Sequence, residues 1–76
     1  MESESNAGIR IVQYDPLPIE LCKLLKAENM AQSGGEAKFL ISEGKVLLNG
    51  EVETRKRKKI ASGDVVTFNG ETIKLA

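Results

Sequence analysis

The strongest structural signals in this chain lie in Gly44-Lys45-Val46-Leu47-Leu48-Asn49-Gly50. Five consecutive cations, Arg55 to Lys59, follow closely. The opening glycine of this stretch fits the position that ends a helix, where a positive φ is needed. Val46 and Leu48 alternate as in a strand, and Asn49-Gly50 is a strong signal for a two-residue hairpin turn. The stretch therefore predicts a helix end, a short strand and a tight turn, with positive charge concentrated just beyond.

Composition limits what the chain can be. It has 76 residues, no histidine, one cysteine and a formal net charge of zero, which fits one small domain. Cys22 lies among leucines and is interpreted as a small buried hydrophobe rather than a reactive thiol. The N-terminus lacks the basic region and apolar run of a signal peptide, so we expect a cytoplasmic protein. We expect residues 1–7 to form a disordered tail and residues 8–76 to form a single domain.

The order of elements predicts the fold class. A weak strand signal covers residues 9–14, and apolar residues at helical spacing predict a first helix over residues 19–28. A second helix should begin after Ser33, and two hairpins should turn at Asn49-Gly50 and Asn69-Gly70. This order predicts an α+β fold in which two helices pack on a small, mostly antiparallel sheet.

The start of the second helix carries the capping-box pattern. The Ser33 hydroxyl can accept from the amide of Glu36, and the Glu36 carboxylate can reach back to the Ser33 N–H. A flexible Gly-Gly loop and a phosphate-binding glycine loop are the alternatives, but the Walker lysine pattern and a preceding strand are missing.

The basic run has two interpretations. If the strand stayed regular, Val52, Thr54 and Ile60 would face the core, but two of the lysines would then point inward, so a bulge or loop is expected. The run could be a solvated loop or an edge strand charged against aggregation. Arginine, the better phosphate fork, alternates with lysine in it, and Lys38 and Lys45 could border the same surface, which favours binding of a polyanion.

Other chemistry is poorly represented. Tyr14, Phe39 and Phe68 are interpreted as structural, so an aromatic stacking platform is not expected. Acid–base catalysis would need a carboxylate or lysine with a shifted pKa. The candidate carboxylates are expected at exposed positions: Glu20, Glu36, Glu43, Glu51 and Glu53. No cluster has metal-ligand spacing. We therefore expect neither an enzyme nor a bound cofactor or metal.

A set of residues in order resembles a known family. Ser33-Gly34, Ala37, Leu40-Ile41, Gly44, Asn49-Gly50 and Gly63-Asp64 stand at the spacing of the S-four (S4) RNA-binding domain, the αL motif. The run from Val52 to Ile60 is similar to that of the small free-standing bacterial YbcJ-like proteins. The resemblance implies a two-helix αL fold and RNA binding. The arginine that usually follows the serine is Gly34 here, which puts a phosphate contact common in the family in doubt.

The resemblance and the basic run together predict the RNA-contacting residues. They lie on the second helix, at its end, at the hairpin turn and in the basic run: Ser33, Lys38, Lys45, Asn49, Arg55, Lys56, Arg57, Lys58 and Lys59. We expect a monomer that binds RNA, such as ribosomal or other structured RNA, with no membrane and no small-molecule substrate as partner. The alternative is a protein-interaction module that docks an acidic partner such as a ribosome-associated factor.

Overall fold

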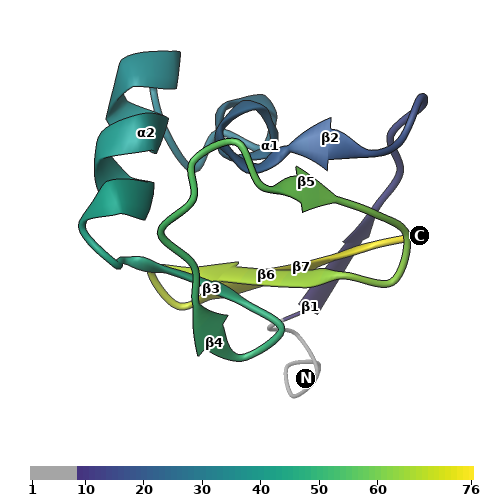
Figure 1. Cartoon of the computed structure of the whole chain (residues 1–76). Helices are drawn as coiled ribbons and strands as arrows, with labels where there is room; N and C mark the ends of the chain where they lie inside the picture. The colour runs from purple at the N-terminus through teal and green to yellow at the C-terminus, as the bar shows by residue number, and fades with distance from the viewer. Residues whose placement is uncertain (1–8) are drawn as a thin grey trace.

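The structure, a computed structural model, describes residues 9–76; the tail predicted for residues 1–7 lies outside the described residues. The first half of the described chain contains two short strands and both helices, and the second half contains five strands (Figure 1). The elements in chain order are β1 (Ile9–Val12), β2 (Ile19–Glu20), α1 (Leu21–Ala27), α2 (Gly34–Ser42), β3 (Val46–Leu48), β4 (Glu51–Val52), β5 (Lys59–Ile60), β6 (Val65–Phe68) and β7 (Glu71–Leu75).

The molecule has two layers. A five-stranded sheet in the order β1-β7-β6-β3-β4 forms one layer, and the helices with the small β2–β5 pair form the other (Figure 1). Every neighbouring pair is antiparallel except β1 and β7, which run parallel. The predicted α+β class, with two helices on a mostly antiparallel sheet, is confirmed.

The core lies between the two layers. Alternate residues of the sheet, such as Val46, Val66 and Ile73, face the helices and are fully buried, whereas Ile9 and Ile11 on the opposite face are more than half exposed. The buried set is Leu21, Cys22, Leu24, Leu25, Ala31, Ala37, Ile41, Val46, Leu48, Ile60, Val66, Ile73 and Leu75. Cys22 is thus part of the apolar core, as predicted.

Turn and cap residues behave largely as the sequence predicts. Both Asn-Gly pairs have positive φ at both residues, as a two-residue turn between twisted strands requires, and Gly44 ends α2 with φ +76°. The Ser33 hydroxyl accepts from the Glu36 amide at 3.1 Å. The return bond differs from the prediction, because the Glu36 carboxylate accepts from the Gln32 amide at 2.6 Å instead of the Ser33 amide.

Two predicted boundaries are wrong. The first strand ends at Val12 rather than residue 14, and the first helix begins at Leu21 rather than residue 19. Ile19 and Glu20 are extended because their backbone pairs with Ile60 and Lys59 of β5. Helical spacing of apolar residues does not exclude such a pairing, since the partner strand lies about forty residues away in the chain.

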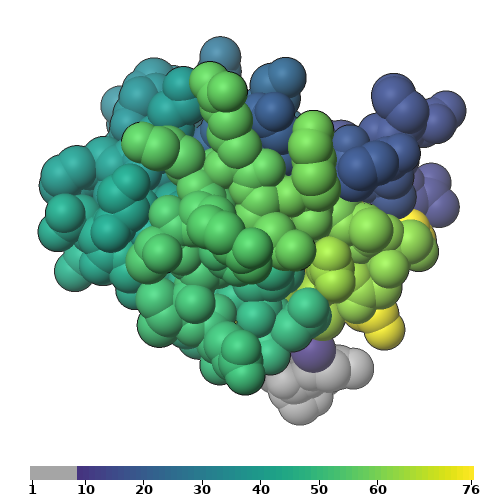
Figure 2. Space-filling model, in the orientation of Figure 1, coloured from purple at the N-terminus to yellow at the C-terminus, as the bar shows by residue number. Residues whose placement is uncertain are grey.

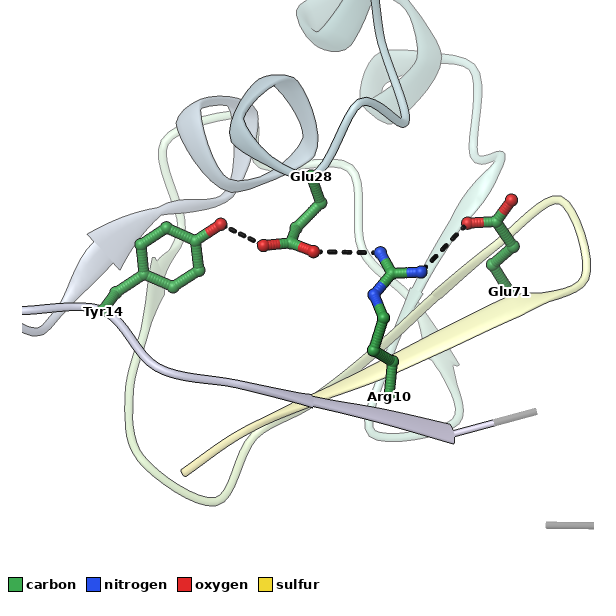
Figure 3. A network of polar contacts seen from close by, with 4 residues as sticks. All are labelled: Arg10, Tyr14, Glu28 and Glu71. Carbon is green, nitrogen blue, oxygen red and sulfur yellow. Dashed lines mark hydrogen bonds and ion pairs between the residues drawn. The ribbon is translucent and has the colours of Figure 1, made fainter. Parts of the chain in front are cut away.

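A polar network connects Arg10 and Tyr14 with the C-terminal end of α1 and with β7 (Figure 3). Arg10 on β1 contacts the Glu28 carboxylate at 2.9 Å and Glu71 of β7 at 3.8 Å. The Tyr14 hydroxyl donates to the other Glu28 oxygen. Burial, followed by this hydrogen bond, raises the pKa of Tyr14 to about 12. The C-terminal end of α1 is therefore fixed against β1.

Within residues 9–76, no helix has the length and apolar character needed to cross a membrane.

Candidate functional site

The chain between β4 and β5, here called the basic loop (residues 53–58), is joined to the start of α1. The Leu21 amide donates to the Lys58 carbonyl at 2.9 Å, and the Cys22 amide donates to the Lys56 carbonyl at 3.1 Å. Glu20, the N-cap residue, makes no side-chain cap bond. Because the first amides of a helix lack partners within the helix, the loop carbonyls act as its cap. This places the basic loop beside both helices (Figure 1).

The loop begins with an internal ion pair. Glu53 accepts hydrogen bonds from the Arg55 side chain, at 2.8 Å from Nε and 3.0 Å from Nη2, and from the Arg55 amide at 3.0 Å. These bonds lower the pKa of Glu53 to about 2. Glu53 was expected to be exposed, but it is buried.

The burial of Glu53 follows from the hairpin register. A two-residue turn sets an even-numbered residue opposite an odd-numbered one, so Leu48 pairs with Glu51 and Leu47 with Val52. The Glu53 amide continues the ladder by donating to the Val46 carbonyl at 3.0 Å. Of the three residues that a regular strand would turn toward the core, Val52 is 59% exposed and Thr54 is exposed, whereas Ile60 is buried. The prediction that the basic run leaves the strand and forms a loop is confirmed.

The five cations of the run are not equivalent. Arg55 is paired with Glu53, and Lys59 on β5 lies 3.8 Å from a Glu20 oxygen, directly across the β2–β5 pair. Lys56, Arg57 and Lys58 have no ion-pair partner within 4 Å among residues 9–76. Cations without an ion-pair partner in the described part of the chain are therefore concentrated at the middle of the basic loop.

A groove lies where the basic loop meets the two helices. This cationic groove, of about 440 Å³, is lined by Lys23 and Lys26 of α1, Lys38 of α2 and Arg57 of the loop, with one carboxylate, Glu20. Figure 2 shows the loop side chains projecting between α1 and α2. Four cations against one carboxylate give the groove a positive potential that suits a polyanion.

Of the predicted contact residues, Lys38 and Arg57 line this groove, and the others do not. Gly34, which follows Ser33, lines it, but the Ser33 hydroxyl is occupied as the α2 cap. Arg55 and Lys58 line a different hollow with Asn49. The Asn49 side chain is engaged there, accepting from the Val65 amide at 2.9 Å and donating to Asp64 at 3.2 Å. Lys45 is exposed between α2 and β3.

Sequence reasoning missed Lys23 and Lys26. Both are exposed on the polar side of α1, but nothing in the sequence gives the direction in which that side points. Their spacing of three residues put them on one face of a helix. Only the contacts of the basic loop with α1 turn that face toward Lys38 and Arg57.

Phe39 also differs from its prediction. It was interpreted as structural, but it is 61% exposed. Ala37 and Ile41 of α2 face the core, and a residue two positions from each lies on the opposite side of a helix.

Among residues 9–76, no cluster of His, Cys, Asp or Glu side chains could hold a metal ion.

Comparisons with known proteins place the chain in a family. Residues 12–76 match the family model described as "S4 domain". The Escherichia coli (strain K12) protein named "Putative RNA-binding protein YbcJ" is 49% identical over 57 residues, which cover 75% of this chain and 81% of that protein. The Bacillus subtilis (strain 168) protein named "Probable ribosome maturation protein RlbA" is 41% identical over 59 residues, covering 78% and 83%. The solution structure of YbcJ from E. coli, described as having an αL motif involved in RNA-binding, aligns with a TM-score of 0.66 at 41% identity and covers 100% of this chain and 95% of its own.

The Glu53–Arg55 pair predicts a pH-dependent contribution to stability. Since the folded-state pKa of Glu53, about 2, lies below the ordinary value of 4.5, its contribution is complete above pH 4.5 and is lost as the pH falls toward 2. Glu53→Gln should therefore lower the free energy of unfolding at pH 7, and the difference from wild type should shrink steadily below pH 4.5. Urea denaturation across this pH range measures it. Glu51→Gln, at an exposed carboxylate, is the matched control and should show no such trend; an equal loss in both variants would contradict the assignment.

Proposed function

The chain belongs to the S4 domain family, and from this premise we propose that it is a non-enzymatic RNA-binding protein that holds the RNA backbone in the cationic groove. The observation that carries the proposal is the convergence of Lys23, Lys26, Lys38 and Arg57 from three separate segments on one surface. Cations that converge in this way suit the closely spaced phosphates of a nucleic acid. The names of the YbcJ and RlbA relatives support RNA as the partner.

The basic loop extends the proposed contact surface. Lys56 and Lys58 have no ion-pair partner in the described part of the chain, and their carbonyls fix the loop to α1. The family resemblance implies that Lys45 and Asn49 lie at the edge of this surface. Ser33, Arg55 and Lys59 each already have a protein partner, so we propose that they support the shape of this surface. RNA contact at all these positions stays a prediction.

The setting we propose is ribosome assembly. Its support is the printed name of the B. subtilis relative, a ribosome maturation protein. The competing function, docking of an acidic protein, would use the same cations. Capture of ribosomal components that survives ribonuclease treatment would favour the protein partner, and capture that ribonuclease abolishes would favour RNA.

The first test removes one groove cation. Lys38→Gln should weaken binding to a structured RNA and make the log–log salt slope shallower by about 0.7 to 1, because one phosphate contact is lost. Lys74→Gln is the control, since Lys74 is exposed on β7 and lines none of the hollows at the basic loop. Fluorescence anisotropy over a salt series measures both variants. Equal effects of the two substitutions would refute the groove as the binding site.

A second test adds a cation. Gly34 lines the groove at the position where the family usually has arginine, and a Cβ built there meets nothing within 4 Å. Gly34→Arg should therefore fold normally, tighten RNA binding and steepen the salt slope by about 0.7 to 1. Gly35→Arg is the matched control, because the neighbouring position has comparable room, with only the Ser33 hydroxyl at 3.9 Å, but does not line the groove. A gain of the same size from both would indicate a general charge effect and count against the groove.

A further inference from the structure

A second hollow adjoins the cationic groove. It lies between residues 14–19 and the start of α1, has a volume of about 290 Å³, and is lined in part by Tyr14, Pro16 and Pro18. Glu20 and Lys23 line both this hollow and the cationic groove. The two spaces are therefore neighbours on the surface, with part of their walls in common.

The two spaces differ in charge. The groove has four cations and one carboxylate, whereas the hollow has two cations, Lys23 and Lys59, and two carboxylates, Asp15 and Glu20. The excess of cations in the groove favours a phosphate, whereas the equal numbers of cations and carboxylates in the hollow do not. The hollow suits a neutral group with an apolar face and polar edges, and a nucleobase is such a group. The volume of the hollow lies at the lower end of the range for small-ligand pockets, roughly 300 Å³, which suits one base rather than a larger ligand.

Glu20 has unused hydrogen-bonding capacity at the junction. Its side chain is only 23% exposed, and Lys59 Nζ lies 3.8 Å from one oxygen, beyond hydrogen-bond distance. Among the described residues, the one hydrogen bond it accepts comes from the Cys22 thiol at 4.0 Å, a weak donor. An ionised carboxylate can accept several hydrogen bonds. A carboxylate beside a phosphate-binding groove weakens phosphate binding, so this position calls for a ligand that donates hydrogen bonds.

We propose that this hollow binds an unpaired guanine of the RNA whose backbone lies in the cationic groove, and that Glu20 reads its Watson–Crick edge. The inference rests on the proposed RNA binding. Guanine presents two adjacent donors on that edge, the N1–H and the N2 amine, which match the two oxygens of a carboxylate. Adenine, cytosine and uracil each present a single donor group there. Tyr14, Pro16 and Pro18 supply the apolar wall for the base.

The test compares stem-loop RNAs of one stem sequence whose loops alternate uracil with guanine, adenine or inosine. Fluorescence anisotropy should show the wild-type protein binding the guanine loop about tenfold more tightly than the adenine loop, the discrimination expected of a paired hydrogen-bond contact. Inosine keeps the N1–H but lacks the N2 amine, so its loop should bind with intermediate affinity. Glu20→Gln should remove the guanine preference, because an amide cannot accept at both positions, and should tighten binding of the adenine loop, because a negative charge is removed from the lining of the groove.

The control variant is Glu43→Gln, at the exposed C-cap of α2, which should keep the guanine preference. Circular dichroism verifies that both variants are folded. Salt-dependent binding of all three loops with equal affinity would overturn the guanine site and leave the proposed RNA binding intact. A guanine preference that persists in Glu20→Gln would also overturn it. Absence of binding to every RNA would overturn both proposals.

Discussion

Two backbone hydrogen bonds, from the amides of Leu21 and Cys22 to the carbonyls of Lys58 and Lys56, determine the geometry of the candidate site. A seven-residue helix such as α1 is too short to be stable alone. Its N-terminus lacks a side-chain cap and depends on the basic loop. The same bonds hold the loop in place against its own charge repulsion. One contact thus stabilises the helix and places Arg57 opposite the lysines of both helices.

The distribution of charge explains how a chain of net charge zero can present a cationic surface. Carboxylates are used to position cations that serve the fold: Glu53 holds Arg55, Glu28 holds Arg10, and Glu20 lies near Lys59. The lysines of the groove carry charge that these pairs do not neutralise. Glu20 is the exception within the groove, and its position between the groove and the neighbouring hollow gives it a role other than attraction of phosphate.

Local sequence signals predicted much of the fold. Asn49-Gly50 and Asn69-Gly70 fixed both hairpins because the turn geometry depends only on adjacent residues. Ser33 and Gly44 marked the ends of α2 for the same reason. The α+β class followed from the order of these elements.

The errors concern strand pairing and side-chain direction, which depend on how the elements contact one another. Ile19 and Glu20 are a strand because of β5, and Glu53 is buried because of the register set across the hairpin. The site was predicted in part: the sequence identified the basic run and Lys38, but not Lys23 and Lys26, whose direction depends on the loop carbonyls capping α1. Phe39 was misplaced because hydrophobicity alone does not say which side of a helix faces the core.

The central claim is that RNA binds where α1, α2 and the basic loop meet. A titration of the ¹⁵N-labelled protein with a structured RNA, followed by two-dimensional amide NMR, tests it most directly. The account predicts that shifted amides concentrate at Cys22, Lys26, Gly34, Lys38 and Arg57, while those of β1 and β7 stay in place. Shifts concentrated instead on the outer face of the sheet, around Ile11 and Lys74, would contradict it.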